Sequence, residues 1–457
     1  MRRATEFFAD ERAEGLHTVG VSEHRTDVMG HVTGRTQFYA DRAFPGMLYL
    51  KMVRSPHHHA RLKAVDASEA EKAPGVVRVL THADVPANVY TILRLIQVEP
   101  NDEPVLAVDK VRFRGEPIVA IVAESLAAAN AAVAKVKIAY DVLPAVLDME
   151  EALKPGAPLV NEYHGQNWFI YEGHHCRRVR FGDVEKGFAE ADHVIEETYQ
   201  SSPIEHAPVE TTGCIVVPEA NGRLTCYSNT QALFFTLDNA GLILNVPFHK
   251  LRMVGGTVGG AFGGKVDVIT EPIAYLAAML TNRPVRYFYT REEEMQVSSP
   301  RAAERLVIKD GVMNDGRIVA RKITLYVDAG AYSRHSPYGT TKAAAHMPGP
   351  YTIPNVWVDA HCVYTNRTPS SAMRGFGVTI ADFALEVQMD KLARLVGMDP
   401  MELRILNAYR DGDMKAHGKL TDGAALVETI QAAAKLADWP LSPAAMAASS
   451  MRRGAQR

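Results

Sequence analysis

One glycine-rich stretch constrains the fold of this chain more than any other part of the sequence. Residues 255–265 read Gly-Gly-Thr-Val-Gly-Gly-Ala-Phe-Gly-Gly-Lys, so six of eleven residues are glycine. Glycine adopts positive φ and lets the backbone approach another group closely, and exposed amides in such a turn can bind an anion. Composition alone leaves a tight turn between packed elements as an equal alternative. Phe262 speaks against a plain linker, because a bulky ring needs a surface to pack on.

A nucleotide-binding interpretation of this stretch is incomplete. Residues 259–265 fit the G-x4-G-K pattern of P-loop NTPases, but Val266 stands where a Ser or Thr would bind magnesium. No three glycines have the G-x-G-x-x-G spacing of a dinucleotide fingerprint. A P-loop-like NTPase therefore remains only the third alternative for function.

Length, composition and charge limit the class of protein. The 457 residues indicate two or three domains at roughly 150 residues each. A formal charge of −3 argues against nucleic-acid binding through a global basic field. No apolar stretch approaches the ~20 residues of a membrane span, and residues 1–15 lack the apolar region of a secretion signal. We therefore expect a cytoplasmic protein with neither a membrane nor a nucleic-acid partner.

Cysteines and clustered histidines give no metal motif. The four cysteines are too few and too scattered for a disulfide framework or an iron–sulfur cluster; they are Cys176, Cys214, Cys226 and Cys362. Neighbouring histidines occur at 57–59 and 174–175, but adjacent histidines rarely face one ion, and no pair has zinc spacing. The sequence therefore predicts no metal site formed by these side chains.

Hydrophobic patterns divide the chain into an α/β part and a larger mixed part. Strands are predicted over 46–53, 76–80, 117–123, 136–140, 214–217, 224–228 and 323–327, and helices over 67–73, 125–133, 383–396, from 399 onward, and 426–434. Residues 150–182 lose periodicity and contain several prolines and glycines. We expect an α+β protein with domains at 1–150 and 183–457, joined by a linker over 151–182.

A second cluster, Ser371-Ala372-Met373-Arg374-Gly375-Phe376-Gly377, contains a charged and an aromatic side chain between glycines. The guanidinium of Arg374 offers a planar fork for a phosphate or a polarised oxygen. The ring of Phe376 offers a flat face. Alone, this motif also fits a surface turn.

Taken together in their order along the chain, these segments resemble the molybdopterin-binding subunit of the xanthine dehydrogenase and aldehyde oxidase family. The motifs that carry the resemblance are Val32-Thr33-Gly34-Arg35, Pro45-Gly46-Met47-Leu48, Arg54-Ser55-Pro56-His57, Arg114-Gly115-Glu116-Pro117, Glu205-His206 with Glu210, the 259–265 loop, Asp328-Ala329-Gly330-Ala331-Tyr332 and Arg374-Gly375-Phe376-Gly377. The resemblance implies an N-terminal α/β hammerhead domain followed by the first half of a molybdopterin-binding domain.

The resemblance implies a molybdenum hydroxylase, which oxidises a carbon next to nitrogen or oxygen with water as the oxygen source. Molybdenum would be held by molybdopterin, either as such or as its cytosine dinucleotide. Electrons would pass to iron–sulfur clusters and FAD on partner subunits. Residues on the cofactor side would be Gly260, Phe262, Gly263 and Arg374, and Phe376 would stack on the substrate ring.

Departures from the family pattern bear on catalysis and substrate. The Glu that acts as general base belongs to a second half that this chain does not contain, so no catalytic residue is assigned here. A partner chain would supply it, as in nicotinate dehydrogenase, where the large subunit is split. Val266 stands where xanthine-oxidising members have a purine-binding Glu, Lys342 where they have an Arg, and Ile204 where a Gln is common. Plain xanthine oxidation is therefore disfavoured.

These departures leave two main hypotheses. The first is a molybdopterin-binding chain acting on a nicotinate-like or purine-like heterocycle or on an aldehyde, with Val266, Lys342 and Phe376 near the substrate. Its partners would be a second molybdopterin-binding chain, an iron–sulfur subunit and an FAD subunit. The alternative is a truncated or scaffold paralogue without cofactor.

Overall fold

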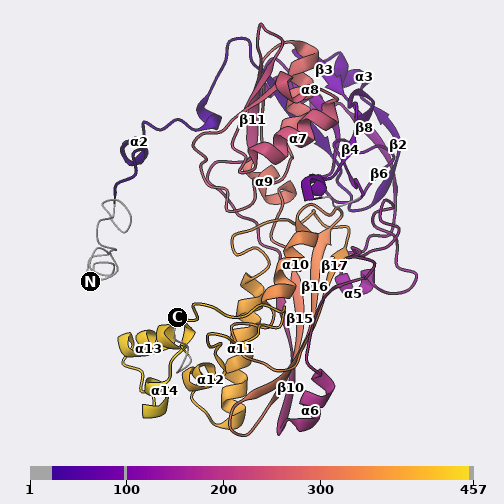
Figure 1. The fold of residues 1–457 in the computed structure, drawn as a ribbon. Coiled ribbons are helices and arrows are strands. Elements are labelled where there is room, and N and C mark those ends of the chain that lie inside the picture. Colours follow the sequence, from indigo (N-terminus) through magenta and orange to yellow (C-terminus); the bar gives the residue numbers. More distant parts are fainter. Residues whose placement is uncertain (1–22, 97–99, 452–457) are drawn as a thin grey trace.

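The structure is a computed structural model, which describes residues 23–96 and 100–451. It has two lobes, each built around a β-sheet (Figure 1). Residues 1–15, on which the expectation about a secretion signal rests, lie outside the described ranges. Within those ranges no helix has the length and apolar character needed to cross a membrane.

The upper lobe in Figure 1 contains a seven-stranded sheet that joins distant parts of the chain. Its order is β13-β12-β11-β14-β1-β7-β3. The strands are β1 (Leu48–Arg54), β3 (Val76–Leu80), β7 (Pro117–Ala123), β11 (Gly213–Pro218), β12 (Leu224–Ser228), β13 (Leu251–Val254) and β14 (Val285–Phe288). Strand β1 pairs in parallel with β14, with Leu48 opposite Val285. One sheet thus takes strands from both sides of the expected linker, and the domain limits 1–150, 151–182 and 183–457 stay a proposal.

Helix α8 (Glu271–Thr281) forms much of the core of this lobe, and α7 (Leu233–Leu244) packs beside it. The sequence of α8 is apolar on all sides, and Ile273, Tyr275 and Leu276 are buried against the sheet. A helix that is hydrophobic all round must be covered all round. Because this burial holds α8 against the sheet, it also fixes the position of the chain that leads from the glycine-rich loop into the helix.

The lower lobe contains a five-stranded sheet of order β10-β15-β16-β17-β9. The strands are β9 (Arg177–Phe181), β10 (His193–Ser201), β15 (Glu304–Val312), β16 (Ile318–Gly330) and β17 (Val356–Tyr364). Strand β9 lies inside the segment expected to be a linker, and it pairs antiparallel with β17. The last residues of that segment are therefore an edge strand.

Helix α11 (Thr379–Val396) packs on the lower sheet with the predicted face. Leu385, Met389 and Leu392 are buried, and Gly397 ends the helix with φ 66°. The next helix, α12 (Pro400–Asn407), is capped by Asp399, whose carboxylate accepts the N–H groups of its first turn. These local signals were correctly interpreted because capping and periodicity act within a few residues.

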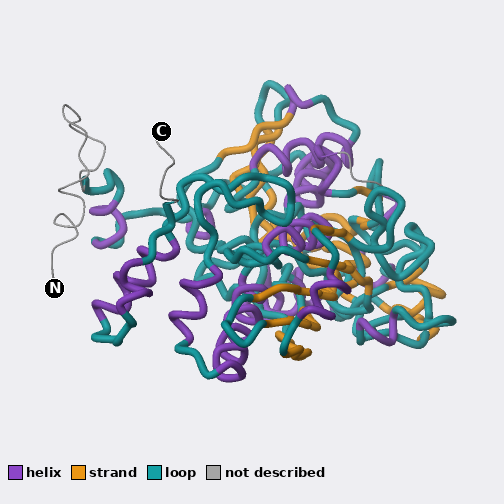
Figure 2. Tube along the Cα trace, turned by 60° about the horizontal axis from the view of Figure 1, so that its bottom comes forward, coloured by secondary structure: helices purple, strands orange, loops and turns teal. Residues whose placement is uncertain are grey.

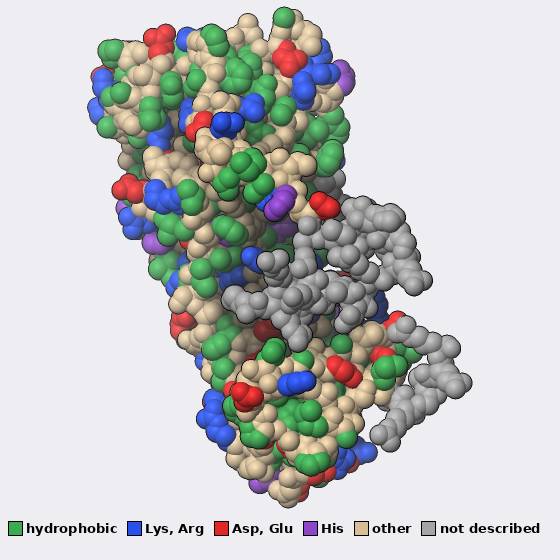
Figure 3. All heavy atoms as spheres, turned by 90° about the vertical axis from the view of Figure 1, so that its left-hand side faces the viewer, with side chains coloured by type: hydrophobic (Ala, Val, Ile, Leu, Met, Phe, Trp, Pro, Cys, Tyr) green, Lys and Arg blue, Asp and Glu red, His purple; other side chains and the backbone are tan. Residues whose placement is uncertain are grey.

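The remaining elements are α2 (Val28–Val32), η2 (Tyr39–Asp41), β2 (Ala60–Asp66), α3 (Ser68–Glu71), η3 (His82–Asp84), β4 (Val89–Tyr90), η4 (Ile92–Ile96), β5 (Glu103–Pro104), β6 (Lys110–Val111), α4 (Leu126–Val133), β8 (Lys137–Val142), α5 (Met149–Ala152), α6 (Val184–Glu190), η5 (Phe248–Lys250), α9 (Arg291–Val297), α10 (Ser336–His346), α13 (Leu426–Leu436) and α14 (Pro443–Ala447). The last helices lie to one side, away from the strands (Figures 1 and 2). Basic and acidic side chains are interspersed on the face in Figure 3.

Candidate functional site

The glycine-rich loop runs from β13 to α8 and closes on the distant turn 371–377. Gly263 has φ 106°, and a Cβ atom there would lie 2.5 Å from the carbonyl oxygen of Ala372. The backbone N–H of Arg374 donates to the carbonyl oxygen of Phe262 at 2.8 Å. Three residues predicted for the cofactor side, Phe262, Gly263 and Arg374, are thus brought together. Only glycine fits at position 263.

Three successive amides of this loop are left for a ligand. Within the described residues, the backbone N–H groups of Gly260, Ala261 and Phe262 have no hydrogen-bond acceptor. Gly260 has φ 95° and Phe262 has φ 52°. Successive amides in such turns form a concave site for an anion. These N–H groups can therefore hold a negatively charged group, as can the amides of Thr257 and Val258 earlier in the loop, which are also unbonded among the described residues.

Phe262 itself is held in an unusual conformation. A positive φ is rare for an aromatic residue and costs on the order of 1–3 kcal/mol where it persists. The ring is 49 % exposed rather than packed in the core. An exposed aromatic face beside free amides fits a flat, anionic ligand.

The other end of the loop is anchored by buried polar groups. Lys265 is 1 % exposed, and its Nζ donates to the carbonyl oxygen of Glu210 at 2.7 Å and lies 3.7 Å from Glu210 Oε2. That carboxylate also accepts the N–H of Gly259 at 2.8 Å. The N–H of Gly263 donates to Gln231 Oε1 at 2.9 Å. Burial lowers the pKa of Lys265.

This anchoring argues against the P-loop interpretation. The lysine of a P-loop must reach the phosphates of the nucleotide. The ammonium of Lys265 is instead turned into the protein, onto Glu210. Together with Val266, this removes both side chains that an NTPase would need from the motif.

Hydrogen bonds and close packing hold the backbone of the turn 371–377, whereas the guanidinium of Arg374 is free. Arg301 Nη2 donates to the carbonyl oxygen of Arg374 at 2.6 Å, and Arg301 Nη1 donates to Thr379 Oγ1 at 3.2 Å. Gly377 packs so closely that a Cβ atom would lie 2.4 Å from the carbonyl oxygen of Gly339. The side chain of Arg374 is exposed and has no partner in the described part of the chain.

Two predicted substrate residues meet through α10. The ring of Phe376 packs on Gly339, where a Cβ atom would lie 2.8 Å from it. It also lies 5.8 Å from the ring of Tyr338, centroid to centroid. Lys342 Nζ lies 5.1 Å from the centroid of that same tyrosine ring. Tyr338 therefore stands between Phe376 and Lys342, and sequence analysis did not single it out.

Val266 is half-buried, and the residue that follows it contacts His335 and Ser371. Asp267 Oδ1 lies 2.8 Å from His335 Nδ1 and accepts the hydroxyl of Ser371 at 2.8 Å. The His335 ring is edge-on to Phe376. Burial raises the pKa of Asp267, but the hydrogen bond and charge of His335 outweigh it, so the pKa is lowered. The sequence held one sign of this role, which is the single Asp between two valines. Such an Asp is expected to be buried, and a buried charge needs partners.

A buried carboxyl group lies beside the Arg374 turn. Glu304, at the start of β15, lines a small cavity with Arg301, Met373 and Phe376. Its Oε2 atom has no hydrogen-bond partner among the described residues. Burial raises the pKa of Glu304 to about 7, although the nearby charge of Arg301 opposes the rise. This group therefore changes its charge near neutral pH.

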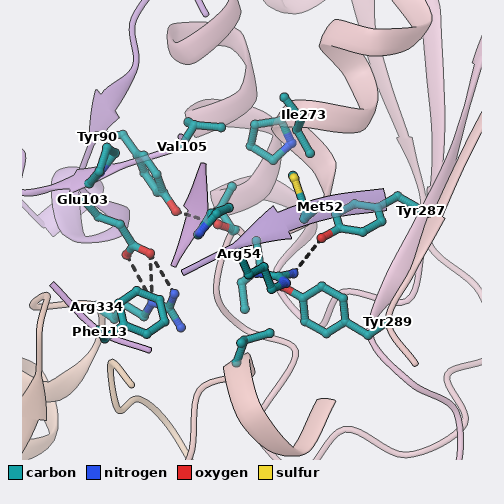
Figure 4. Close-up of a pocket in the computed structure, with 16 residues that line it drawn as sticks. Met52, Arg54, Tyr90, Glu103, Val105, Phe113, Ile273, Tyr287, Tyr289 and Arg334 are labelled. Atoms are coloured by element: carbon teal, nitrogen blue, oxygen red, sulfur yellow. Dashed lines mark hydrogen bonds and ion pairs between the residues drawn. The ribbon is translucent and has the colours of Figure 1, made fainter. Parts of the chain in front are cut away.

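A second buried cavity lies behind the site, and Figure 4 shows the side chains that line it. Arg334 Nη2 donates to Glu103 Oε1 at 2.7 Å, and Arg54 Nη2 donates to the hydroxyl of Tyr287 at 2.8 Å. Arg334 Nη1 lies 3.9 Å from Asp267 Oδ2. Arg334, which lies between β16 and α10, thus stands beside Asp267, two residues after the glycine-rich loop.

Comparison with known proteins agrees with this geometry. A profile described as molybdopterin cofactor-binding domain matches residues 169–408. A profile described as aldehyde oxidase and xanthine dehydrogenase, a/b hammerhead domain, matches residues 33–144. The chain belongs to the xanthine dehydrogenase and aldehyde oxidase family. The predicted fold, a hammerhead domain followed by a molybdopterin-binding domain, is confirmed.

Relatives of this molybdopterin-binding chain differ in length. A probable xanthine dehydrogenase subunit of Bacillus subtilis is 36 % identical, over 89 % of this chain and 53 % of its own length. The nicotinate dehydrogenase large molybdopterin subunit of Eubacterium barkeri is 35 % identical, over 91 % of this chain and 95 % of its own length. The chain thus spans about half of the first relative and almost all of the second.

Solved structures of the family have the same fold. The aldehyde oxidoreductase from Desulfovibrio gigas superposes with a TM-score of 0.84 at 31 % identity, covering 92 % of this chain and 47 % of that one. Quinoline 2-oxidoreductase from Pseudomonas putida 86 also gives 0.84, at 28 % identity, covering 92 % of this chain and 54 % of that one. These relatives are oxidoreductases by name.

Proposed function

We propose that this chain is the molybdopterin-binding chain of a molybdenum hydroxylase that works with partner chains. The observation that carries the proposal is the contact between the glycine-rich loop and the Arg374 turn. It sets the unbonded amides of Gly260 to Phe262 next to the backbone of Arg374, whose exposed guanidinium has no partner among the described residues. Donors of this kind suit a phosphate-bearing, anionic cofactor.

The residues present fit molybdopterin, either as such or as its cytosine dinucleotide. The amides at 260–262 and the fork of Arg374 would hold its anionic groups, and the exposed ring of Phe262 would lie against it. Gly263 keeps the loop in contact with the turn, because any side chain there meets Ala372. When bound, the cofactor supplies a metal centre that oxidises a carbon next to nitrogen or oxygen, with water as the oxygen source.

Side chains beside the cofactor residues favour a flat substrate of low charge. Phe376 would orient an aromatic ring by stacking, and Val266 would present an apolar surface to it. Lys342 would act at the edge of this region, as a point charge held over Tyr338. We infer a nicotinate-like or purine-like N-heteroaromatic ring, or an aldehyde, as the substrate.

The catalytic base would come from another chain. The carboxylate of Glu205 accepts the hydroxyl of Ser298 at 2.7 Å, and that of Glu210 accepts the N–H of Gly259 and lies 3.7 Å from Lys265 Nζ, so both carboxylates hold the fold. The near-complete coverage of a nicotinate dehydrogenase large molybdopterin subunit supports a split enzyme. We propose a second molybdopterin-binding chain that carries the Glu, an iron–sulfur subunit, an FAD subunit and a cytoplasmic location.

The test is a metal and subunit analysis of the complex purified from its native host through a tag on this chain. We expect molybdenum in equimolar amount, iron, and a co-purifying chain that carries the second half. A metal-free chain without such a partner would overturn the proposal and favour a scaffold paralogue. Heterocycles and aldehydes would then be compared as substrates of the metal-containing complex.

A further inference from the structure

The outer face of β9 and β17 brings the neighbouring residues His175 and Cys176 together with His361, which lies far along the chain. One donor atom each from His175, Cys176 and His361 lies within 4.8 Å of the others. In the part of the chain that the structure describes, this is the one group of three or more His, Cys, Asp or Glu donors with such spacing. Adjacent histidines at 174–175 gave no metal motif because the third donor comes from β17.

The register of the two strands explains why these groups meet. Arg177 pairs with Ala360 in the antiparallel β9–β17 ladder. Continuing that register by one residue puts Cys176 opposite His361, and directly opposite side chains on one face are close neighbours. The ring of His175 stacks on the ring of His361, with 5.4 Å between centroids.

We propose that His175, Cys176 and His361 form a zinc site at this edge of the lower sheet. Two imidazoles and one thiolate are donors that Zn²⁺ prefers, at about 2.0–2.3 Å from the ion. The donor atoms now lie within 4.8 Å of one another, and they must move closer together to reach such distances from a single ion. His175 is exposed and its side chain can rotate to make this approach, while Tyr326 stacks on His361 at 5.0 Å and holds that ring in place.

Zinc binds cysteine as the thiolate and histidine as the neutral imidazole. Binding would release the thiol proton of Cys176 to solvent.

Asp359 completes the surroundings of the sulfur. It lies two residues before His361 on β17, and Cys176 Sγ is 3.5 Å from its Oδ1 atom. Its carboxylate is held by Arg180 and by Trp357 Nε1, the latter at 2.8 Å. Because both oxygens of Asp359 already have partners, this residue stands beside the donor set and is not one of its three members. The ion would tie the segment before β9 to β17 and so fasten the edge strand of the sheet.

Zinc titration of the tag-free, reduced and metal-stripped chain tests this site without molybdopterin. We expect one saturable Zn²⁺ site by calorimetry and a higher Tm when zinc is bound. His175→Ala removes an exposed ligand and should not disturb folding. The affinity of this variant for zinc should fall at least about tenfold, because mutating even the residues that only support zinc ligands lowers metal affinity by about that factor. His174→Ala is the matched control, because His174 is an exposed neighbour outside the donor set.

Cobalt as a probe identifies the sulfur ligand. Co²⁺ bound to the wild-type chain should show a thiolate-to-metal charge-transfer band, and Cys176→Ser should lose it. His361→Ala should weaken binding as His175→Ala does. Absence of saturable zinc binding would overturn the proposal. So would equal affinities in the wild type and the three ligand variants, or an equal loss in His174→Ala and His175→Ala.

Discussion

The two turns of the candidate site rest on opposite kinds of buried charge. Beneath the glycine-rich loop, the ammonium of Lys265 meets Glu210, whose carboxylate also accepts a backbone amide. Beside the Arg374 turn, Glu304 is also buried, but its Oε2 has no hydrogen-bond partner among the described residues. The first turn is therefore held by satisfied charges, while the second contacts a group whose charge depends on pH.

Removing the partnered charge should have the largest effect on stability. Lys265→Met leaves the carboxylate of Glu210 buried without its counter-charge. Breaking a buried pair by removing one partner costs about 3–5 kcal/mol, so we expect the free energy of unfolding to fall by about 4 kcal/mol in urea denaturation. Lys342→Met is the control, because Lys342 is only partly buried and contacts a tyrosine ring. Equal losses in both variants would show that the Glu210 pair does not anchor the loop.

The unpartnered carboxyl group predicts a pH dependence. The pKa of Glu304 is raised from 4.5 to about 7 in the folded state. The folded chain therefore binds this proton more tightly than the unfolded chain. The contribution of Glu304 to stability is therefore fully present below pH 4.5 and is lost as the pH rises to about 7, by about 3 kcal/mol at 1.36 kcal/mol per pKa unit.

Glu304→Gln should abolish this decline. Its free energy of unfolding should equal that of the wild type near pH 4.5 and exceed it by about 3 kcal/mol at pH 8. Glu196→Gln, at an exposed position of β10, should keep the wild-type profile. Parallel profiles for Glu304→Gln and the wild type would show that Glu304 does not titrate in this range.

The close contact between the two turns should be sensitive to a single methyl group. In Gly263→Ala, the new Cβ meets the carbonyl oxygen of Ala372 and the residue keeps a positive φ. We expect a loss of about 2 kcal/mol in unfolding free energy. Gly222→Ala is the matched control, since Gly222 has φ 77° but a Cβ there meets only the Lys250 ammonium, at 3.7 Å. If both variants lose the same amount, backbone conformation alone explains the effect, and the contact contributes nothing.

Neutralising the exposed guanidinium should leave stability unchanged but weaken cofactor retention. Arg374→Gln should alter the free energy of unfolding by less than about 0.5 kcal/mol. Loss of a hydrogen bond from a charged group costs about 1.5–3 kcal/mol, so molybdopterin should be held about tenfold less tightly. Arg394→Gln removes the same charge from the exposed surface of α11 and should retain the cofactor fully. Molybdenum contents of the two purified complexes provide the measurement.

Local signals explain which parts of the fold the sequence predicts. Strands 76–80, 117–123 and 224–228 coincide with β3, β7 and β12 because alternation and turn residues act over a few positions. The pairing of β1 with β14 and the place of β9 in the lower sheet depend on residues far apart in the chain. No local pattern records such pairing, so the segment 151–182 resembled a linker throughout.

The candidate site shows the same difference between what the sequence predicts and what only the structure reveals. Glycine spacing pointed to the 259–265 loop, and Arg374 and Phe376 were identified through the resemblance to the family. Their contact through Phe262 and Ala372 required the structure. Asp267, His335 and Glu304 were missed because their importance comes from burial and from partners in distant segments.

The central claim is that the glycine-rich loop and the Arg374 turn together hold molybdopterin. The most direct test is the molybdenum and subunit content of the complex purified from its native host through this chain, with Arg374→Gln in parallel. We expect equimolar molybdenum and a partner chain in the wild type, and the same subunits with much less molybdenum in the variant. A wild-type chain without molybdenum, or a variant that keeps it fully, would contradict the claim.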